Sequence, residues 1–305
     1  MLHRAAIFAM HTRFELVLEG RDETQARAAS EAALAVIEAC DARWSRFQSD
    51  SLVSRINRDA GAHWVRVDPE TFDVLERCLA WKHATRGAFD VAVGAPMDRV
   101  REDCEPAGSP AGAFELDATR SSVRFTIEGT QLDFGGVGKG AALDLAAEAL
   151  REAGIERALL HGGTSSVLGL GAPPESPEGW PIGLGVEFEH RTVMLRDRAL
   201  SISAARGSRE GSTRVHVVDP RSGFALLGDS RCAVVAPTAA EAEAWSTALL
   251  VLAARGVDIV AETPPQLEFA LRPALGVVAG RARTLEPART PSCETAAASA
   301  STLRA

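Results

Sequence analysis

The spacing of apolar residues in the first half of the chain indicates helices. Two are expected, one from Asp22 towards Trp44 and one that begins at Asp68-Pro69-Glu70 and ends at Gly87. In front of each, an aspartate can accept hydrogen bonds from the free N–H groups of the first turn, and proline suits the first helical position. Residues 44–57 lie between them, and their hydroxyl-rich composition predicts a loop with a short helix.

Short alternating or apolar runs are typical of the second half and indicate strands. One helix, residues 239–254, interrupts them, and the charged residues 101–119 are expected to form a surface connection. Long helices in the first half of the chain and many strands in the second half predict an α+β fold. The expected strands cover residues 14–19, 158–160, 182–187, 192–195, 199–203, 214–218, 232–235, 267–271 and 275–279.

Between the two halves, an apolar run over residues 123–134, predicted to turn near Gly129, leads into a glycine-rich turn and a helix that ends at Gly154. Glycine lets a ligand approach the backbone, and the free amides of a helix N-terminus attract anions. The segment is not a nucleotide P-loop, because Asp133 replaces its first glycine and Gly140 its hydroxyl residue, and it lacks the G-x-G-x-x-G fingerprint. A glycine turn without a ligand stays open as an alternative.

The net charge and the cysteines argue against several classes of protein. The formal net charge of −8 argues against a general nucleic-acid binder. The five cysteines are odd in number and scattered without a C-x-x-C pair, so we expect buried or free thiols and neither a disulfide framework nor a zinc site. They are Cys40, Cys78, Cys104, Cys232 and Cys293.

The N-terminal residues and the hydropathy of the chain indicate the cellular compartment that is expected. The apolar run in residues 1–10 is too short for a signal peptide, and no cysteine follows it for lipid attachment. No apolar run is long enough to span a membrane. A cytoplasmic protein is therefore expected, with a disordered tail over residues 281–305, where Ala, Ser, Thr, Arg and Pro dominate.

Five motifs occur along the chain in an order and spacing that resemble those of the ApbE family, the FAD:protein FMN transferases. They are Met10-His11-Thr12, Phe47 to Asn57, Thr85 to Asp90, Asp133 to Asp144 and His216 to Gly223. The resemblance implies a fold related to the T-fold, with mixed sheets packed against helices and a ligand cleft between two subdomains. It also implies one family domain over residues 1–280.

The resemblance further implies a reaction. Family members cleave the pyrophosphate of FAD, place FMN on a Thr or Ser hydroxyl of an acceptor protein and release AMP. Mg²⁺ is the expected cofactor, since it prefers oxygen ligands and neutralises phosphate charge. The expected acceptor is a flavoprotein such as an electron-transfer subunit or a reductase. Many family members are exported lipoproteins, in contrast to the expectation for this chain.

Candidate site residues follow from the matched motifs. The metal ligands are expected to be the carbonyl oxygen of Gly136 and the side chains of Glu243 and Thr247, which lie four apart on one helix face. His216 is the expected general base, because an ordinary histidine pKa suits proton removal near neutral pH. The residues expected to contact FAD are Met10, Phe47, Ala88, Phe89, Asp90, Asp133, Lys139, Gly162 and Gly163.

Several positions depart from the family pattern. Glu243 stands where the family has aspartate, Thr164 follows two glycines where aspartate is common, and Ala204-Ala205 replaces a serine–glycine pair. The chain also has no tyrosine. Two other functions therefore stay open: a hydrolase that splits FAD into FMN and AMP, and an FAD-binding protein that has lost its chemistry. For single residues, core packing of Phe89 and a structural His216 are the alternatives.

Overall fold

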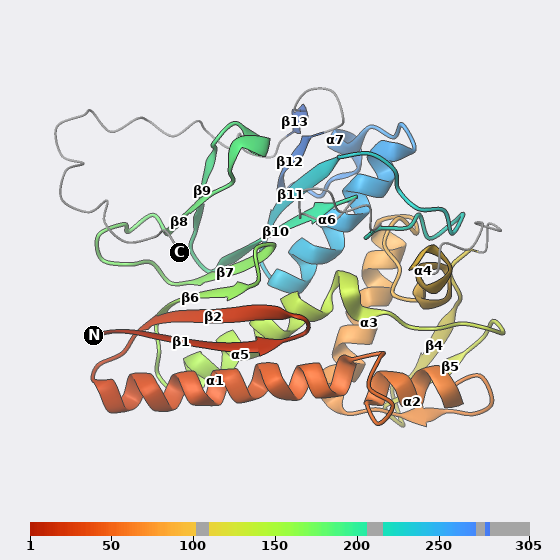
Figure 1. The fold of residues 1–305 in the computed structure, drawn as a ribbon, viewed down its shortest axis with the longest axis horizontal. Coiled ribbons are helices and arrows are strands. Elements are labelled where there is room, and N and C mark those ends of the chain that lie inside the picture. Colours follow the sequence, from red (N-terminus) through yellow and green to blue (C-terminus); the bar gives the residue numbers. More distant parts are fainter. Residues whose placement is uncertain (102–109, 206–215, 273–277, 281–305) are drawn as a thin grey trace.

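The computed structural model describes residues 1–101, 110–205, 216–272 and 278–280. Its main element is an eight-stranded sheet in which each pair of neighbouring strands is antiparallel (Figure 1). In spatial order the strands are β1 (Leu2–Ala9), β2 (Thr12–Glu19), β6 (Arg157–Gly162), β7 (Ser166–Leu170), β10 (Arg198–Ala204), β11 (Arg231–Ala236), β12 (Glu268–Arg272) and β13 (Val278–Gly280).

Both faces of this sheet are covered. Helices α1 (Glu23–Trp44), α5 (Gly138–Glu152) and α6 (Ala239–Ala254) pack on one face, and the β8 (Trp180–Gly183)–β9 (Thr192–Leu195) hairpin packs on the other. Because side chains alternate along a strand, Leu168 of β7 joins the core under the helices, whereas its neighbour Val167 joins a second apolar cluster with Trp180 and Leu195.

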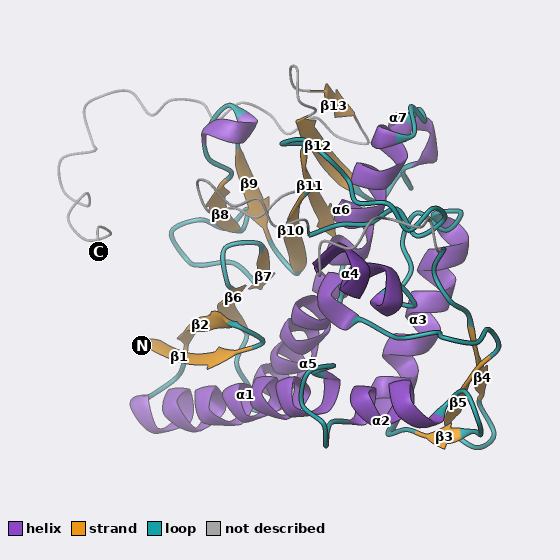
Figure 2. Cartoon of the chain, turned by 45° about the vertical axis from the view of Figure 1, so that its right-hand side comes forward, coloured by secondary structure: helices purple, strands orange, loops and turns teal. Residues whose placement is uncertain are grey.

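A smaller group of elements lies beyond the C-terminal end of α1 (Figure 2). It contains α2 (Leu52–Asp59), α3 (Pro69–Ala84), α4 (Gly94–Arg101) and a sheet of β3 (Val65–Arg66), β5 (Ser122–Phe125) and β4 (Phe114–Asp117). The indole N–H of Trp44, at the end of α1, donates to the hydroxyl of Thr71 in α3 at 2.9 Å. One apolar core joins this group to the large sheet.

The α+β expectation is confirmed, and so are the helices whose starts were read from their caps. Asp22 accepts from the backbone N–H of Gln25 at 2.9 Å, and Asp68 accepts from that of Thr71 at 2.9 Å. The helix expected over residues 239–254 and the strand over 192–195 have those bounds as α6 and β9. The strands expected over 14–19, 158–160, 199–203, 232–235 and 267–271 are found with slightly different ends.

Four expectations about elements are corrected. The run 123–134 is not a hairpin, because β5 pairs with β4 and β3 instead. The connection 101–119 contains β4, where apolar Phe114 and Leu116 alternate with acidic residues. The strand over 182–187 ends at Gly183, and a short α7 (Ile259–Glu262) and α4 were not expected.

The fourth correction is the strand over residues 214–218. Residues 214 and 215 lie outside the described part of the chain, and Val218 forms only an isolated bridge with Ala225. Pro220, two residues after Val218, has no N–H to donate, so the pairing cannot continue past it in that direction. The strand over 275–279 is described only from Val278, as part of β13.

The described cysteines, Cys40, Cys78 and Cys232, are free and buried, as expected; Cys104 and Cys293 lie outside the described residues. The tail 281–305 lies outside them too. Among the helices that the structure describes, none has the length and apolar character needed to cross a bilayer.

Candidate active site

The glycine-rich turn crosses from the smaller group of elements to the large sheet. Its first residues are held by the smaller group: the side chain of Asn57 exchanges two hydrogen bonds with the backbone of Leu132, at 2.7 and 3.0 Å, and the N–H of Asp133 donates to the carbonyl of Val91 at 2.8 Å. Helix α5 then begins at Gly138 without a side-chain cap. Its first N–H groups are therefore available to an anion.

Helix α5 also positions the start of α6. A Cβ on Gly140 would lie 2.4 Å from the carbonyl oxygen of Ala239, so only glycine permits this approach. One turn later, the buried carboxylate of Asp144 accepts from the backbone N–H groups of Ala239 at 2.7 Å and Ala240 at 3.0 Å. Burial raises the pKa of Asp144 to about 6, against the opposing effect of these two N–H groups.

This packing brings Lys139 and Glu243 together. The ammonium of Lys139 lies 2.9 Å from Oε1 of Glu243, and the hydroxyl of Ser166, at the start of β7, donates to the same oxygen at 2.5 Å. The Glu243 side chain is 4 % exposed. Its other oxygen, Oε2, is buried and has no hydrogen-bond partner within the described part of the chain.

The expected metal ligands meet beside this ion pair. Thr247 follows Glu243 by one turn of α6, and a Cβ on Gly136 would lie 3.8 Å from its hydroxyl oxygen. Ser203 of β10 lies 3.1 Å from the same hydroxyl. A buried carboxylate oxygen without a partner, a hydroxyl and a backbone carbonyl are ligands that Mg²⁺ accepts, so the residues fit this ion.

The described residues contain no cluster of three His, Cys, Asp or Glu side chains that could hold a metal ion. A cation at this site would therefore depend on one carboxylate together with neutral oxygen atoms. Such a site suits an ion that also has phosphate oxygens and water as ligands.

The expected FAD contacts at residues 88–90 lie in the wall of the site. Ala88 and Phe89 are buried, and Phe89 packs edge-on against Trp81 with its ring 3.6 Å from the Cβ position of Gly136. Asp90 is bonded on both oxygens, with Oδ2 2.5 Å from Lys82 of α3 and Oδ1 accepting from the N–H of Ala92 at 2.9 Å. Burial raises the pKa of Asp90, against the effect of Lys82.

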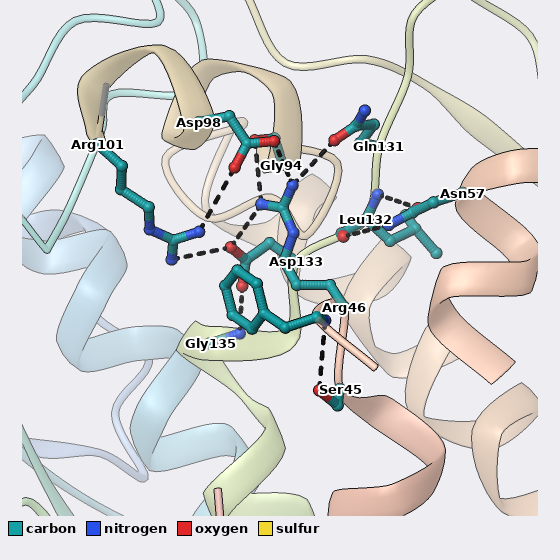
Figure 3. Close-up of polar contacts among 11 residues, drawn as sticks. Ser45, Arg46, Asn57, Gly94, Asp98, Arg101, Gln131, Leu132, Asp133 and Gly135 are labelled. Carbon is teal, nitrogen blue, oxygen red and sulfur yellow. Dashed lines mark hydrogen bonds and ion pairs between the residues drawn. The ribbon is translucent and has the colours of Figure 1, made fainter. Parts of the chain in front are cut away.

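Asp133 shapes the glycine turn through a network of ion pairs (Figure 3). Its Oδ1 accepts from the N–H of Gly135 at 2.7 Å, and its Oδ2 lies 3.0 Å from Arg46 and 3.3 Å from Arg101. The almost fully buried guanidinium of Arg46 also pairs with Asp98 at 2.5 Å. Both carboxylate oxygens of Asp133 are thus used within the protein.

Phe47, expected to contact FAD, follows Arg46 and is 64 % exposed. The guanidinium groups of Arg46 and Arg101 lie 5.7 and 5.4 Å from the centre of its ring. A surface depression of about 220 Å³ adjoins it. The depression is lined by Phe8, Ala9, Met10, His11, Asp41, Ser45, Phe47 and Gln48.

The first motif and the double glycine meet at one edge of the site. Met10 and His11, both with positive φ, form the tight turn between β1 and β2. Gly163 has a φ of +68°, and a Cβ on it would lie 2.3 Å from the hydroxyl of Thr12. A Cβ on Gly162 would lie 3.6 Å from that of Lys139, which links this edge to the Lys139–Glu243 pair.

His216, the expected base, is exposed at the start of a short arm that folds back on itself. Its N–H donates to the carbonyl of Ala205 at 3.1 Å. Two arginines fix this arm: Arg255 at the end of α6 donates to Asp219 at 2.8 Å, and Arg221 donates to the carbonyl of Arg86 at 3.1 Å. Burial raises the pKa of Asp219, but the hydrogen bonds from Arg255 and from the backbone N–H of Arg221, together with the charges of both arginines, lower that pKa overall.

The structure therefore brings Gly136, Lys139, Gly162, Glu243 and Thr247 together, with Phe89 behind them. Met10 and Phe47 line the neighbouring depression. Sequence reasoning missed Arg46, Arg101, Ser166 and Asp144. Arg46 and Asp144 lie within or next to the quoted motifs and could have been found there, whereas nothing local marked Ser166.

Comparisons with known proteins agree with this picture. The ApbE family model matches residues 10–271. A protein of Rhodobacter capsulatus named FAD:protein FMN transferase is 30% identical over 267 residues, which cover 80% of this chain and 50% of the relative. A protein of the same name from Treponema pallidum is 27% identical, and the alignment covers 77% of this chain and 74% of the relative. The chain thus spans half the length of the first of these relatives.

Solved structures agree on the fold. The ApbE protein of Thermotoga maritima superimposes with a TM-score of 0.80 at 23% identity, covering 92% of this chain and 97% of its own. The flavin transferase ApbE of Vibrio cholerae superimposes with a TM-score of 0.72 at 17% identity, and the match covers 92% of this chain and 98% of the Vibrio chain. This likeness supports an α+β fold of the same kind.

Proposed function

The chain belongs to the ApbE family, and on this premise we propose that it is an FAD:protein FMN transferase. It would bind FAD, cleave the pyrophosphate and place FMN on a Thr or Ser hydroxyl of an acceptor flavoprotein, with release of AMP. The proposed acceptor is an electron-transfer subunit or a reductase. The relatives named above carry this activity in their names.

One observation carries the proposal: an uncapped helix N-terminus and a carboxylate oxygen that no described residue contacts occur in the same small site. The first N–H groups of α5 provide positive partial charge for the pyrophosphate. Glu243 is already paired with Lys139 through Oε1, and its buried Oε2, which none of the described groups contacts, can take a metal ion. Metal-assisted transfer of a phosphate group can use both features at one place.

Mg²⁺ would be held by Glu243, Thr247 and the carbonyl of Gly136, and it would neutralise charge on the pyrophosphate. The chain's own residues do the remaining work. Lys139 and Ser166 hold the carboxylate of Glu243, while Asp133 and Arg46 keep the glycine turn in shape. His216 would take the proton of the acceptor hydroxyl, which is otherwise a weak nucleophile.

The test is incubation with FAD, Mg²⁺ and a candidate acceptor, chosen from flavoproteins encoded beside this chain. Covalent flavin on the acceptor, detected by fluorescence in a denaturing gel, together with an equal amount of AMP, would support the proposal. Free FMN and AMP without labelled acceptor would indicate a hydrolase. Bound, unchanged FAD would indicate a binding protein, and either result would contradict a transferase.

A further inference from the structure

The chain contains only two lysines, Lys82 and Lys139, among 33 basic residues. Each lies in an ion pair with a carboxylate that is almost fully buried. Lys82 lies 2.5 Å from Asp90, whose side chain is 3 % exposed, and Lys139 lies 2.9 Å from Glu243, whose side chain is 4 % exposed. Both lysines of the chain thus bind buried carboxylates, although Arg46 shows with Asp133 that an arginine can also pair with one.

The two pairs differ in what they leave unused. Asp90 is satisfied on both oxygens, since Lys82 binds one and the N–H of Ala92 donates to the other. Glu243 receives Lys139 and the hydroxyl of Ser166 on the same oxygen, Oε1, whereas no group of the described residues donates to its buried Oε2. A buried carboxylate oxygen without a partner is unfavourable, so this oxygen points to a ligand.

Arginine would give a different result at position 139. Its planar guanidinium has two parallel donors that match both oxygens of a carboxylate, whereas the lysine ammonium acts as a point charge. The same molecule shows the forked arrangement at Asp219, where Arg255 donates to Oδ2 through Nε at 2.8 Å and to Oδ1 through Nη2. Lysine thus occupies one oxygen of Glu243 and leaves the other available.

We propose that Lys139, together with Ser166, restricts Glu243 to a single coordinating oxygen and thereby makes this site selective for Mg²⁺ over Ca²⁺. The inference rests on the metal site of the proposed function. Ca²⁺ takes six to eight oxygen ligands and commonly binds carboxylates through both oxygens, whereas Mg²⁺ requires a compact octahedron and takes one oxygen from each carboxylate. Lys139 is a positioning residue, because it acts through Glu243.

The experiment measures binding of MgCl₂ and CaCl₂ separately to the full chain by calorimetry. Lys139→Met has a similar length and releases Oε1, so the ratio of Ca²⁺ to Mg²⁺ affinity should rise about tenfold or more. The ratio cancels the general gain in cation affinity that loss of a positive charge produces. Lys139→Arg keeps the charge but covers both oxygens, so it should lose binding of both ions.

Two further variants keep the test decisive. Lys82→Met removes the other lysine without touching Glu243, and its affinity ratio should equal that of the wild type. Ser166→Ala removes one hydrogen bond to Oε1 but keeps Lys139, so it should shift the affinity ratio in the same direction as Lys139→Met and by less. It replaces Lys139→Met in the test if that variant does not fold. Thermal melting in EDTA reports folding of each variant.

Three results would overturn the inference. The wild type could bind neither ion, or Lys139→Met and Ser166→Ala could both keep a ratio of Ca²⁺ to Mg²⁺ affinity within twofold of the wild type. The third is a Lys139→Arg variant that binds Mg²⁺ as well as the wild type does. FMN transfer is followed in parallel on the same proteins. Transfer by the wild type with an unchanged ratio in the variants overturns only the selectivity assignment. A shifted ratio without any wild-type transfer instead contradicts the proposed function.

Discussion

At the scale of single residues, the four buried carboxylates of the described residues divide into three that are bonded on both oxygens and one that has an oxygen left over. Asp90, Asp133 and Asp144 have both oxygens bonded to groups of the chain. In Glu243, no group of the described residues contacts the buried Oε2. Among these four buried carboxylates, only Glu243 can therefore offer an anionic ligand without breaking an existing bond.

Replacing Glu243 by Gln should test this distinction. The amide has almost the same shape, so folding and FAD affinity should change little, but a neutral oxygen is a much poorer Mg²⁺ ligand. We expect Mg²⁺-dependent turnover to fall by about 10²-fold or more. Turnover is measured across a Mg²⁺ titration, with the exposed Glu148→Gln as control. Activity within a few-fold of wild type at saturating Mg²⁺ would remove Glu243 from the site.

Replacing His216 by Asn should separate a catalytic from a structural role. If His216 takes the proton of the acceptor, the single-turnover rate of transfer should fall by about two to four orders of magnitude. FAD affinity and melting temperature should stay unchanged, because the side chain is exposed. The wild-type rate should also decrease at low pH, since a protonated imidazole cannot accept a proton. A variant with the wild-type rate and pH profile would contradict this role.

At the scale of elements, the site depends on how helices and loops are tied to one another. The arm that begins at His216 is held by the pair of Asp219 with Arg255, which joins it to the end of α6. The start of α6 is held by Asp144 from α5. Helix α6 thus carries the expected ligands Glu243 and Thr247 and, through Arg255 at its C-terminal end, holds the arm that begins at the expected base.

The ion pair of Asp219 with Arg255 should also affect how the free energy of unfolding changes at acid pH. Against the effect of burial, the hydrogen bonds and charges of Arg255 and Arg221 lower the pKa of Asp219 below its unfolded value. Their stabilising effect is therefore present above that unfolded value and is lost as the pH falls through the lower folded one. We expect Asp219→Asn to reduce the free energy of unfolding by about 1–3 kcal/mol at pH 7, since it leaves Arg255 partly unpaired. The loss should shrink below about pH 4. Urea unfolding of both proteins at several pH values measures this difference, and a pH-independent difference would argue against the pair.

Packing of α5 on α6 gives a second prediction at this scale. Gly140→Ala places a Cβ 2.4 Å from the carbonyl oxygen of Ala239, so the helices must separate. Overpacking of this kind costs about 1–3 kcal/mol. Thermal unfolding of the variant should show it, and the shift of α6 should weaken Mg²⁺ binding as well. The exposed Gly61→Ala, with no atom near its Cβ, is the control. Equal stability of the two variants would mean that the helices can adjust.

At the scale of the whole molecule, sequence reasoning succeeded where the deciding contact is local. Asp22 and Asp68 identified α1 and α3 because a cap and its partner are three residues apart. It failed where the partner is distant: Arg46 meets Asp133 from 87 residues away, and Ser166 meets Glu243 from 77. The expected metal ligands came from the family resemblance, whereas the ion pair of Lys139 with Glu243 required the fold.

Binding of FAD should stabilise the molecule as one unit. The residues expected to contact it come from both groups of elements, Phe47 and Asp133 from one side and Lys139 and Gly162 from the other, and one apolar core joins the groups. FAD at 100 times its dissociation constant should raise the free energy of unfolding by about 2.7 kcal/mol, and hence the melting temperature by roughly 5 °C or more. AMP alone, as control, should do less because it lacks the flavin half.

Melting is followed by far-UV circular dichroism and by tryptophan fluorescence. Trp64 and Trp81 lie in the smaller group, Trp180 and Trp245 pack on the large sheet, and Trp44 lies where the two meet. Both signals should shift together; two separate transitions, of which FAD moves only one, would show that the groups unfold independently and that the ligand does not join them.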